Sequence, residues 1–355
     1  MKALMNCGLL VSVLLLTTLL ILSGCKKDKE DPIKKKYVWA VGSADSTGYG
    51  TIYFSDNGGD HCVRQGEGAA SIQGVNLFDV WAVDENTVWA VGDNNVIIKT
   101  MDGGITWNRI AAPSKRSEVE LTSISIINAT NIWISGSGGT VYNSKDGGNS
   151  WNSVHSDVLV NNYLQGIHAI DPNIVYVTGG PTMTSTGFIA RTIDAGITWD
   201  SIVPANNFNK NRWIGVTSSN ASNIVIYGGR SHYIYSTDGG HSWTNDSIEG
   251  TGGTGGADIN CLKMLDSQTW WGAFDYDGIF ETKDAGDNWL SQGSAPGPKG
   301  MWLFGIDYYD HQLCVIVGES SMSNTGKIIK TANGGQLWEL KLETHAQMHK
   351  VSFIK

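Results

Sequence analysis

The residues best suited to binding or chemistry are seven polar or aromatic side chains, one for each copy of a sequence repeat. They are Asn76, Glu120, Tyr163, Arg212, Asp258, Trp302 and Gln347. Two acids, an arginine, a tyrosine and a tryptophan gathered at one entrance would suit a polar ligand such as a glycan or a peptide. The alternative interpretation is that the entrance to any channel is wet and therefore polar, whether or not it binds a ligand.

Two carboxylates make glycoside hydrolysis the enzymatic alternative. That reaction needs a pair of carboxyl groups roughly 5 to 9 Å apart. Glu120 and Asp258 lie three repeats apart, so we expect them to face each other across the entrance at a larger separation. The chain has six arginines, of which Arg116, Arg212 and Arg230 could reach the same face. These features favour binding without catalysis over hydrolysis.

The repeat that positions these residues is an eight-residue phrase, Ser/Thr-x-Asp-x-Gly-x-Ser/Thr-Trp, which occurs seven times between residues 55 and 338. Its aspartate position falls at residues 57, 102, 146, 194, 238, 284 and 333, which are 44 to 49 residues apart. Two copies have decayed: Asn57 and Asn333 replace the aspartate, and Cys62 replaces the first tryptophan. A repeat of this length built from short strands indicates a radial array.

Each repeat contains four strand-like segments separated by turn signals. In the third repeat these segments are residues 121–127, 132–136, 140–144 and 151–154. Seven such sheets predict an all-β fold, a seven-bladed β-propeller of four-stranded blades over residues 37–355. The first repeat lacks its innermost strand, and residues 348–354 match the missing one. We therefore expect the C-terminal strand to pair into the N-terminal blade and close the ring.

A second ring of side chains is expected two positions along each innermost strand, because alternate residues of a strand face the same way. Its members are Phe78, Thr122, Gln165, Ile214, Asn260, Phe304 and His349. Of the fourteen tryptophans, ten are assigned to the repeat phrase or to the second strands. The remaining four, Trp81, Trp213, Trp271 and Trp302, are predicted to be available for contacts.

The repeated phrase resembles the Asp-box, or BNR, motif of sialidase-type propellers. In that family the aspartate and the hydroxyl group bond the turn between the third and fourth strands, and the tryptophan packs between sheets. The resemblance implies structural roles, on the rim opposite the ligand face, for Asp102, Asp146, Asp194, Asp238, Asp284, Trp107, Trp151, Trp199, Trp243, Trp289 and Trp338. A sialidase would also need a Phe/Tyr-Arg-Ile-Pro segment. The nearest segment here is Asn108-Arg109-Ile110-Ala111, on an outer strand.

The likeness extends to single-domain, seven-bladed Asp-box propellers such as the photosystem II stability/assembly-factor-like proteins. It is carried by Val-Trp-Ala-Val-Gly at residues 88–92 followed by the phrase at residues 100–107. In the assembly factors a basic patch on one face binds the client. This chain has no such patch, so the same client is not implied. The resemblance implies a non-enzymatic binding or assembly scaffold.

The N-terminus predicts a targeting segment. Lys2 and an apolar run at residues 9–22 predict a signal peptide over residues 1–24 rather than a membrane span. Leu22-Ser23-Gly24-Cys25 resembles the bacterial lipobox, which implies a lipid anchor on Cys25. The charged residues 25–36 predict a solvated tether, and they resemble surface-export signals of lipoproteins. We therefore expect an outer-membrane lipoprotein of the bacterial cell envelope, exposed at the surface.

Composition excludes several other classes of partner. Removing residues 1–24 takes away Lys2 and no acid, which changes the net charge from −9 to −10. With no basic cluster outside the tether, nucleic acid is excluded as a partner. Cys62, Cys261 and Cys314 are an odd number at scattered positions, so we expect no disulfide framework. No Cys-x-x-Cys motif occurs, and we expect no metal and no cofactor. The predicted state is a monomer that docks an envelope protein or a glycan.

Overall fold

The computed structural model describes residues 34–354 apart from 115, 182–185, 203–210, 250–255, 277, 295–300, 321–322 and 324. Residues 35–355 form one compact unit. The predicted signal peptide, Cys25 and the tether up to residue 33 lie outside the described residues. Within the described ranges, no helix has the length and apolar character needed to cross a membrane.

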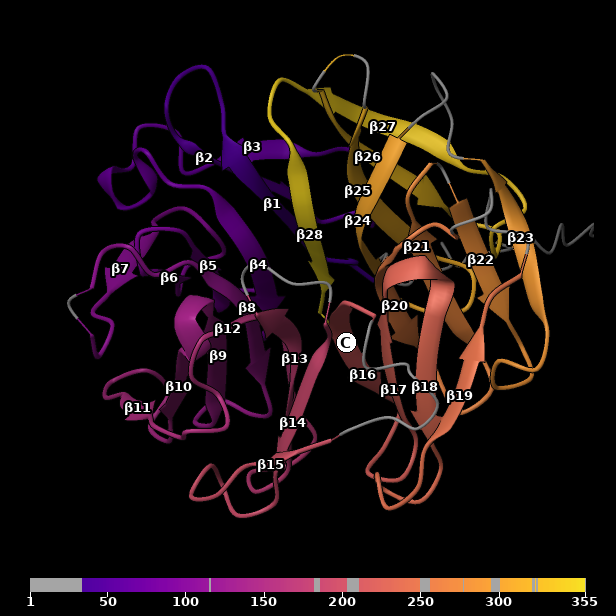
Figure 1. The fold of residues 1–355 in the computed structure, drawn as a ribbon. Helices are drawn as coiled ribbons and strands as arrows, with labels where there is room; N and C mark the ends of the chain where they lie inside the picture. Colours follow the sequence, from indigo (N-terminus) through magenta and orange to yellow (C-terminus); the bar gives the residue numbers. More distant parts are fainter. Residues whose placement is uncertain are drawn as a thin grey trace, which may run out of the picture. The chain divides into compact units, whose positions relative to one another are not determined.

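Seven antiparallel sheets of four strands make up the unit (Figure 1). Blade 1 is formed by β28 (Met348–Phe353), β1 (Val38–Ala44), β2 (Gly50–Ser55) and β3 (Val63–Gln65). Blade 2 is formed by β4 (Leu77–Ala82), β5 (Val88–Gly92), β6 (Val96–Thr100) and β7 (Asn108–Ile110). Blade 3 is formed by β8 (Leu121–Ile126), β9 (Ile132–Gly136), β10 (Val141–Ser144) and β11 (Asn152–Val154).

The other four blades repeat this order of strands. Blade 4 has β12 (Asn162–Ala169), β13 (Val175–Pro181), β14 (Phe188–Thr192) and β15 (Asp200–Ser201), and blade 5 has β16 (Trp213–Ser218), β17 (Ile224–Gly228), β18 (His232–Ser236) and β19 (Thr244–Ser247). Blade 6 has β20 (Ile259–Met264), β21 (Trp270–Phe274), β22 (Gly278–Thr282) and β23 (Trp289–Ser294). Blade 7 has β24 (Met301–Tyr308), β25 (Cys314–Ser320), β26 (Gly326–Thr331) and β27 (Glu339–Thr344).

The ring closes through the two ends of the described chain. Each inner strand contacts its neighbours in the order β28, β4, β8, β12, β16, β20, β24 and back to β28. β28 pairs with β1, and the register joins Val38 to Phe353 and Gly42 to Met348. The predicted seven-bladed propeller and its closure by the C-terminal strand are therefore confirmed.

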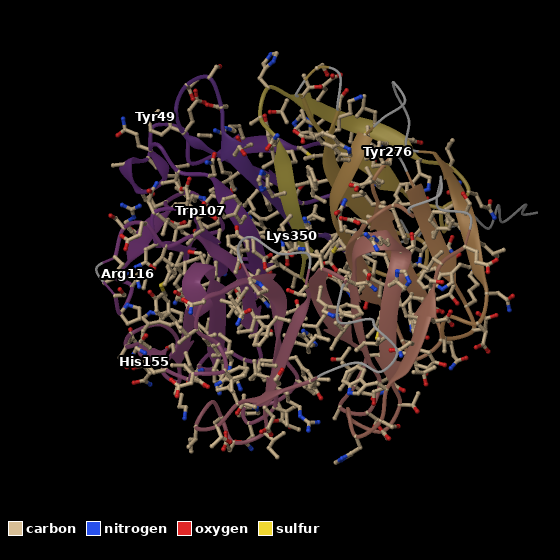
Figure 2. The ribbon with its side chains drawn as sticks, in the orientation of Figure 1. Tyr49, Trp107, Arg116, His155, Tyr276 and Lys350 are labelled. Atoms are coloured by element: carbon tan, nitrogen blue, oxygen red, sulfur yellow. The ribbon has the colours of Figure 1, made fainter. Side chains whose placement is uncertain are left out.

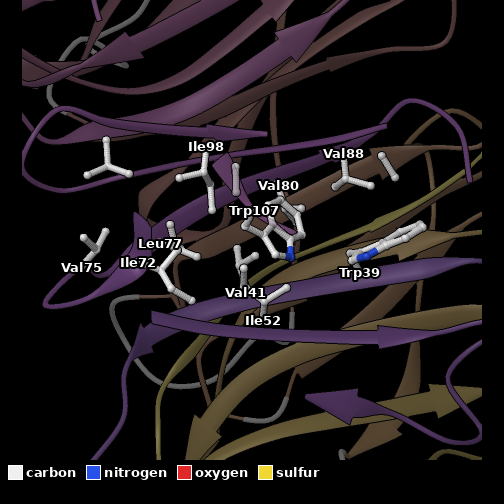
Figure 3. Close-up of a cluster of buried hydrophobic side chains, with 13 residues drawn as sticks. Trp39, Val41, Ile52, Ile72, Val75, Leu77, Val80, Val88, Ile98 and Trp107 are labelled. Atoms are coloured by element: carbon white, nitrogen blue, oxygen red, sulfur yellow. The ribbon is translucent and has the colours of Figure 1, made fainter. Parts of the chain in front are cut away.

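The core lies between neighbouring blades. Second strands such as β5 and β9 are buried along their whole length, because each sheet is covered by a blade on both faces. Figure 3 shows the cluster between blades 1 and 2, where Trp107 of the repeat phrase packs with Trp39 and Ile52 of blade 1. In the same way Trp151 meets Trp89 with ring centroids 6.2 Å apart, and Trp338 meets Trp271 at 5.7 Å. The repeat tryptophans thus join each blade to the one before it.

The five repeat aspartates each bond the turn that contains them. One carboxylate oxygen accepts the backbone N–H of the residue four positions on at 2.8–2.9 Å. The other accepts that residue's side chain at 2.5–2.8 Å. In blade 2, Thr100 Oγ1 also donates to Asp102 at 2.7 Å and accepts the N–H of Gly104, whose φ is 91°. A glycine accommodates this left-handed conformation without steric conflict.

The two decayed copies keep half of this network. The amide oxygen of Asn333 accepts the N–H of Leu337 at 2.9 Å, and that of Asn57 accepts the N–H of His61 at 3.0 Å. An asparagine amide can therefore replace the aspartate carboxylate as the acceptor of this backbone N–H. Each amide oxygen also accepts the hydroxyl two positions before it, from Thr331 at 2.9 Å and from Ser55 at 2.7 Å. Among the described residues, only the titratable carboxylates also accept the side chain four positions on.

This difference predicts how acid acts on the fold. Bonds from the Thr106 hydroxyl and backbone lower the pKa of Asp102 from 3.8 to about 2. Because the folded pKa is the lower one, the stabilisation is complete above pH 3.8 and is lost as the pH falls through about 2. We expect Asp102→Ala to lower the melting temperature by a few degrees at pH 7 and to flatten its decline between these pH values. Asn333→Ala, the matched control, should lower the melting temperature without changing its pH dependence. An equal effect of both substitutions on the acid slope would contradict this account.

Candidate functional site

The seven predicted residues occupy equivalent positions at the start of the inner strands. Each directly precedes the residue that pairs with one equivalent position at or near the end of its blade's second strand, as Asn76 precedes Leu77, which pairs with Gly92. The Asn76 carbonyl accepts the N–H of Asp93 at 3.0 Å, and the same bond recurs at Glu120, Arg212, Asp258 and Gln347 at 2.8–3.3 Å. These bonds hold the backbone of the ring at one end of the channel.

A glycine at the end of the second strand makes this close approach possible in six blades. A Cβ at Gly92 would lie 2.0 Å from the Asn76 carbonyl oxygen, and one at Gly228 would lie 1.9 Å from that of Arg212. Blade 6 has Phe274 at this position, and its backbone bond is the longest of the set at 3.3 Å. The glycine of the recurrent Val-Gly therefore allows the shorter backbone bonds at the channel entrance.

Glu120, Tyr163 and Arg212, from three consecutive blades, come together. The Tyr163 hydroxyl donates to Glu120 Oε2 at 2.8 Å. Burial, followed by this bond and the charge of Glu120, raises the pKa of Tyr163, while the charge of Arg212 acts in the opposite direction. Arg212 is exposed, and Glu120 is half-buried. The group presents a protonated phenol, a carboxylate and a guanidinium at the channel entrance. We call this side of the propeller, where the inner strands begin, the loop-bearing face.

Three of the other predicted residues are held by neighbouring groups. Asn76 donates to Asp93 at 2.9 Å and accepts the N–H of Ala44 from blade 1. Asp258 accepts the N–H of Arg230 at 3.0 Å. Gln347 is hydrogen-bonded to Glu319. The seventh, Trp302, is 36% exposed, which leaves it available for contact with a partner.

Further carboxyls on this face were not among the predicted site residues. Burial and the charge of Glu120 raise the pKa of Asp93, and burial and the charge of Asp258 raise that of Asp275. Both follow the end of a second strand, a position that the repeat alignment could have supplied. The entrance is thus more acidic than the seven residues alone indicate.

The second predicted ring faces the channel, but for a different reason from the one expected. Each of its residues is the one that the register skips, so each forms a β-bulge between its inner strand and the second strand. Six of the seven line a cavity of about 230 Å³: Phe78, Thr122, Gln165, Ile214, Phe304 and His349. Asn260 instead donates to Asp275 at 2.7 Å. Simple alternation along the strand was therefore the wrong explanation.

The tryptophan prediction needs correction. Trp213 is fully buried and Trp271 is 1% exposed, so neither can contact a ligand. Trp213 packs against Gly187 of its neighbouring blade, and Trp271 stacks edge-on with Trp338. Trp81 is half-buried and lines a lower cavity of about 270 Å³ in the channel. Of the four candidates, Trp302 is the most exposed.

Metal and thiol chemistry have little support among the described residues. That part of the chain contains no group of three His, Cys, Asp or Glu residues able to hold a metal ion. His345 and His349 have a spacing that suits a metal on a helix, but here the segment enters strand β28. Cys261 and Cys314 are buried free thiols, and Cys62 is a half-buried one.

Comparison with known proteins agrees with this architecture. Residues 69–212 match the family model described as photosynthesis system II assembly factor YCF48. The predicted likeness to assembly-factor-type propellers is confirmed. No curated protein matches the chain.

Solved structures resemble the assembly-factor-like propeller in fold. YCF48 bound to a D1 peptide is 20% identical, with a TM-score of 0.58 over 75% of this chain and 81% of that chain. A protein from Lactobacillus plantarum is 12% identical, with a TM-score of 0.63 over 90% of this chain and 100% of that chain. A GH74 enzyme of Niastella koreensis is 16% identical, with a TM-score of 0.54 over 89% of this chain and 59% of that chain.

Proposed function

We propose that this protein is a non-catalytic scaffold that docks a protein segment on the loop-bearing face of its propeller. The proposal includes the lipid on Cys25 and a place in the outer membrane of the bacterial cell envelope. Its support from relatives is the match to the assembly-factor family and the likeness to YCF48, a propeller that binds a peptide of D1. The lipid anchor rests on the Leu-Ser-Gly-Cys segment of the sequence.

The observation that carries the proposal is the kind of side chain gathered at the entrance. Trp302, Tyr163 and Arg212 are of the three residue types that contribute most of the binding energy at protein interfaces. They lie at or beside the start of three inner strands, so that regular strands of the scaffold hold the binding residues in place. The acids Glu120, Asp93, Asp258 and Asp275 at the same entrance favour a partner segment that carries positive charge.

The contacts of the N-terminal residues support this choice of face. Lys36 donates its N–H to Asp56 at 3.0 Å and accepts the N–H of Gly58 at 2.8 Å. Lys35 forms an ion pair with Asp56 at 3.0 Å. Asp56 and Gly58 belong to the first repeat turn, on the face opposite the entrance. Lys35 and Lys36 therefore lie on the face opposite the entrance.

Glycoside hydrolysis is the second candidate, and the Tyr163–Glu120 hydrogen bond is the observation that favours it. Sialidase-type enzymes use a tyrosine nucleophile beside a glutamate. Here the raised pKa of Tyr163 disfavours the phenolate that would attack. Arg116, one of the three arginines that could bind a substrate carboxylate, is paired with Glu118 at 2.9 Å. A panel of fluorogenic glycosides, including a sialoside, tests this alternative. Turnover that disappears in Glu120→Gln would replace the scaffold proposal.

Site-specific photo-crosslinking tests the docking face. We expect benzoylphenylalanine at position 302 to form a defined adduct with a partner protein in intact cells. Arg212→Ala in the same chain should reduce that adduct about tenfold, as expected for the loss of an interface arginine. Benzoylphenylalanine at position 105 is the matched control, because Ile105 is 83% exposed on the opposite face. Adducts at position 105 alone, or an adduct at 302 that Arg212→Ala leaves unchanged, would refute the assignment of this face.

A further inference from the structure

The central channel contains a site that the docking proposal does not use. Two cavities, of about 230 and 270 Å³, meet there, and Gln165, Ile214 and Lys350 line both of them. Lys350 lies on β28 among the inner strands (Figure 2). The upper cavity opens toward the ring of Tyr163 and Gln347, both of which also line it.

The wall of the upper cavity is mainly apolar and aromatic. The rings of Phe78 and His349 have centroids 5.4 Å apart, and those of Phe304 and His349 are 6.1 Å apart. Ile214 lies in the same wall. Burial and the charge of Lys350 lower the pKa of His349 to about 4, so this ring is neutral at pH 7. A wall of this kind fits one aromatic ring or a short branched aliphatic group.

The floor of this cavity holds an ammonium group with a weak partner. Lys350 Nζ lies 3.7 Å from Cys261 Sγ, and no carboxylate of the described residues is within ion-pair distance. The acid Asp79 favours the charge, but its Oδ2 accepts bonds from Ser123 and Ile124 and its Oδ1 accepts the N–H of Val80. Burial opposes the charged form of Lys350, yet Cys261, Tyr227 and Asp79 outweigh it, and the pKa of Lys350 is raised. A lysine ammonium has three N–H donors, of which the contact with Cys261 uses one.

Gln165 adds a second polar group at the same level. Its Oε1 is buried without a hydrogen-bond partner in the protein. Since a primary amide carries a donor and an acceptor at its end, its NH₂ can turn toward an anion in the cavity. Lys350 is also the only charged residue among those that line the upper cavity in the described part of the chain.

We propose that the upper cavity binds a small monocarboxylate with an apolar body, whose carboxylate pairs with Lys350 Nζ and Gln165 while its body lies against Phe78, Phe304 and Ile214. An ammonium, an amide and an apolar wall match the three parts of such a ligand. The carboxylate belongs either to a free acid or to the C-terminus of a peptide, and both sources offer the same chemistry. The site adjoins the docking face and shares Tyr163 with it.

Calorimetric titration with 3-phenylpropionate tests this site. We expect saturable one-to-one binding, with at least about tenfold weaker binding of the neutral 3-phenylpropanamide, as loss of a charge-assisted bond implies. A tetrapeptide Gly-Gly-Ala-Phe and its C-terminal amide distinguish the two sources. Binding of both the peptide and the free acid assigns the site to carboxylates in general, and binding of the free acid alone restricts it to small molecules. Absence of binding by either carboxylate overturns the proposal.

Two variants distinguish the contribution of the Lys350 charge to binding from that of the space in the upper cavity. Lys350→Met keeps the approximate length of the side chain and removes its charge. We expect this variant to bind 3-phenylpropionate about tenfold more weakly, or weaker still. Lys263→Met is the matched control, because Lys263 is the other lysine on the inner strands and lines the lower cavity. It should leave binding unchanged. Ile214→Trp fills the upper cavity without altering its charge and should abolish binding even if the lysine variant does not fold. Unchanged binding in Lys350→Met or Ile214→Trp overturns the proposal.

Discussion

Removal of residues 348–355 is expected to abolish cooperative folding of the propeller. These residues form β28, the innermost strand of blade 1, and Met348, Val351 and Phe353 are buried to 4% exposure or less. Full burial of three such side chains contributes roughly 5 kcal/mol or more. That is comparable with the whole stability of an ordinary domain, about 5–15 kcal/mol. Urea unfolding followed by tryptophan fluorescence should therefore show no cooperative transition in the chain that ends at Gln347.

The loss extends beyond one blade, because β28 also bonds both neighbouring blades. Ser352 accepts the N–H of Ala82 in blade 2 at 3.0 Å, and Phe353 donates its N–H to Asp307 in blade 7 at 2.8 Å. Without the strand, β1 would become an exposed edge, and exposed edges promote aggregation. We expect the truncated chain to elute as aggregates in size-exclusion chromatography.

A circular permutation is the control for this truncation. Residues 348–355 placed before residue 37 keep the composition of the protein and change only the order of its strands. The ends lie close together, since Ile354 donates its N–H to Tyr37 at 3.2 Å. The permuted chain should regain a cooperative transition. A truncated chain that melts like the full one would show that β28 does not close the ring.

The fold was predictable because one short phrase fixes both the length and the phase of the repeat. Once Thr100 to Trp107 is placed at the turn between the third and fourth strands, the other three strands of a blade follow from turn signals. The same phase placed Trp302 and the other six entrance residues at equivalent positions. It also identified residues 348–354 as the strand missing from blade 1.

Contacts between distant blades were not predictable in the same way. Lys350 and Cys261 come from blades 1 and 6, and nothing in either local sequence marks them as neighbours. Tryptophan is a common residue at binding sites, yet Trp213 and Trp271 are buried because they pack against adjacent blades. The bulge at Phe78 likewise depends on pairing with a second strand, which the period of a single strand does not show.

The second large effect is a fall in stability as the pH drops from 6.5 toward 4, caused by His349. Burial and the charge of Lys350 lower the pKa of this ring from 6.5 to about 4. Over that interval the unfolded chain binds a proton at His349 and the folded chain does not. Stability therefore rises with pH across the interval and is lost as the pH falls. A difference of this size corresponds to at most about 3 kcal/mol, at 1.36 kcal/mol for each pH unit.

The structure accounts for the neutral ring. His349 Nε2 lies 2.9 Å from Ser43 Oγ, between the aromatic rings of Phe78 and Phe304. Protonation would place a second positive charge beside Lys350, in a part of the channel whose wall is mainly apolar. Both effects oppose the imidazolium. The free energy of unfolding from urea titrations at pH 7.5, 6, 5 and 4 measures the result.

Substitution separates this effect from the other titrating groups. His349→Gln keeps a polar side chain near Ser43 and removes the titration, so we expect its stability to fall much less between pH 6.5 and 4 than that of the unmodified protein. His155→Gln is the control, since His155 is exposed and its substitution should leave the slope unchanged.

Raised pKa values at Asp93, Asp275 and Glu319 act in the opposite direction, because the folded carboxyls take up protons first as the pH falls. Those groups are present in every variant, so the difference between His349→Gln and His155→Gln isolates His349. Equal slopes in the two variants would show that His349 titrates normally in the channel, and they would remove the argument that Lys350 is the sole cation of the upper cavity.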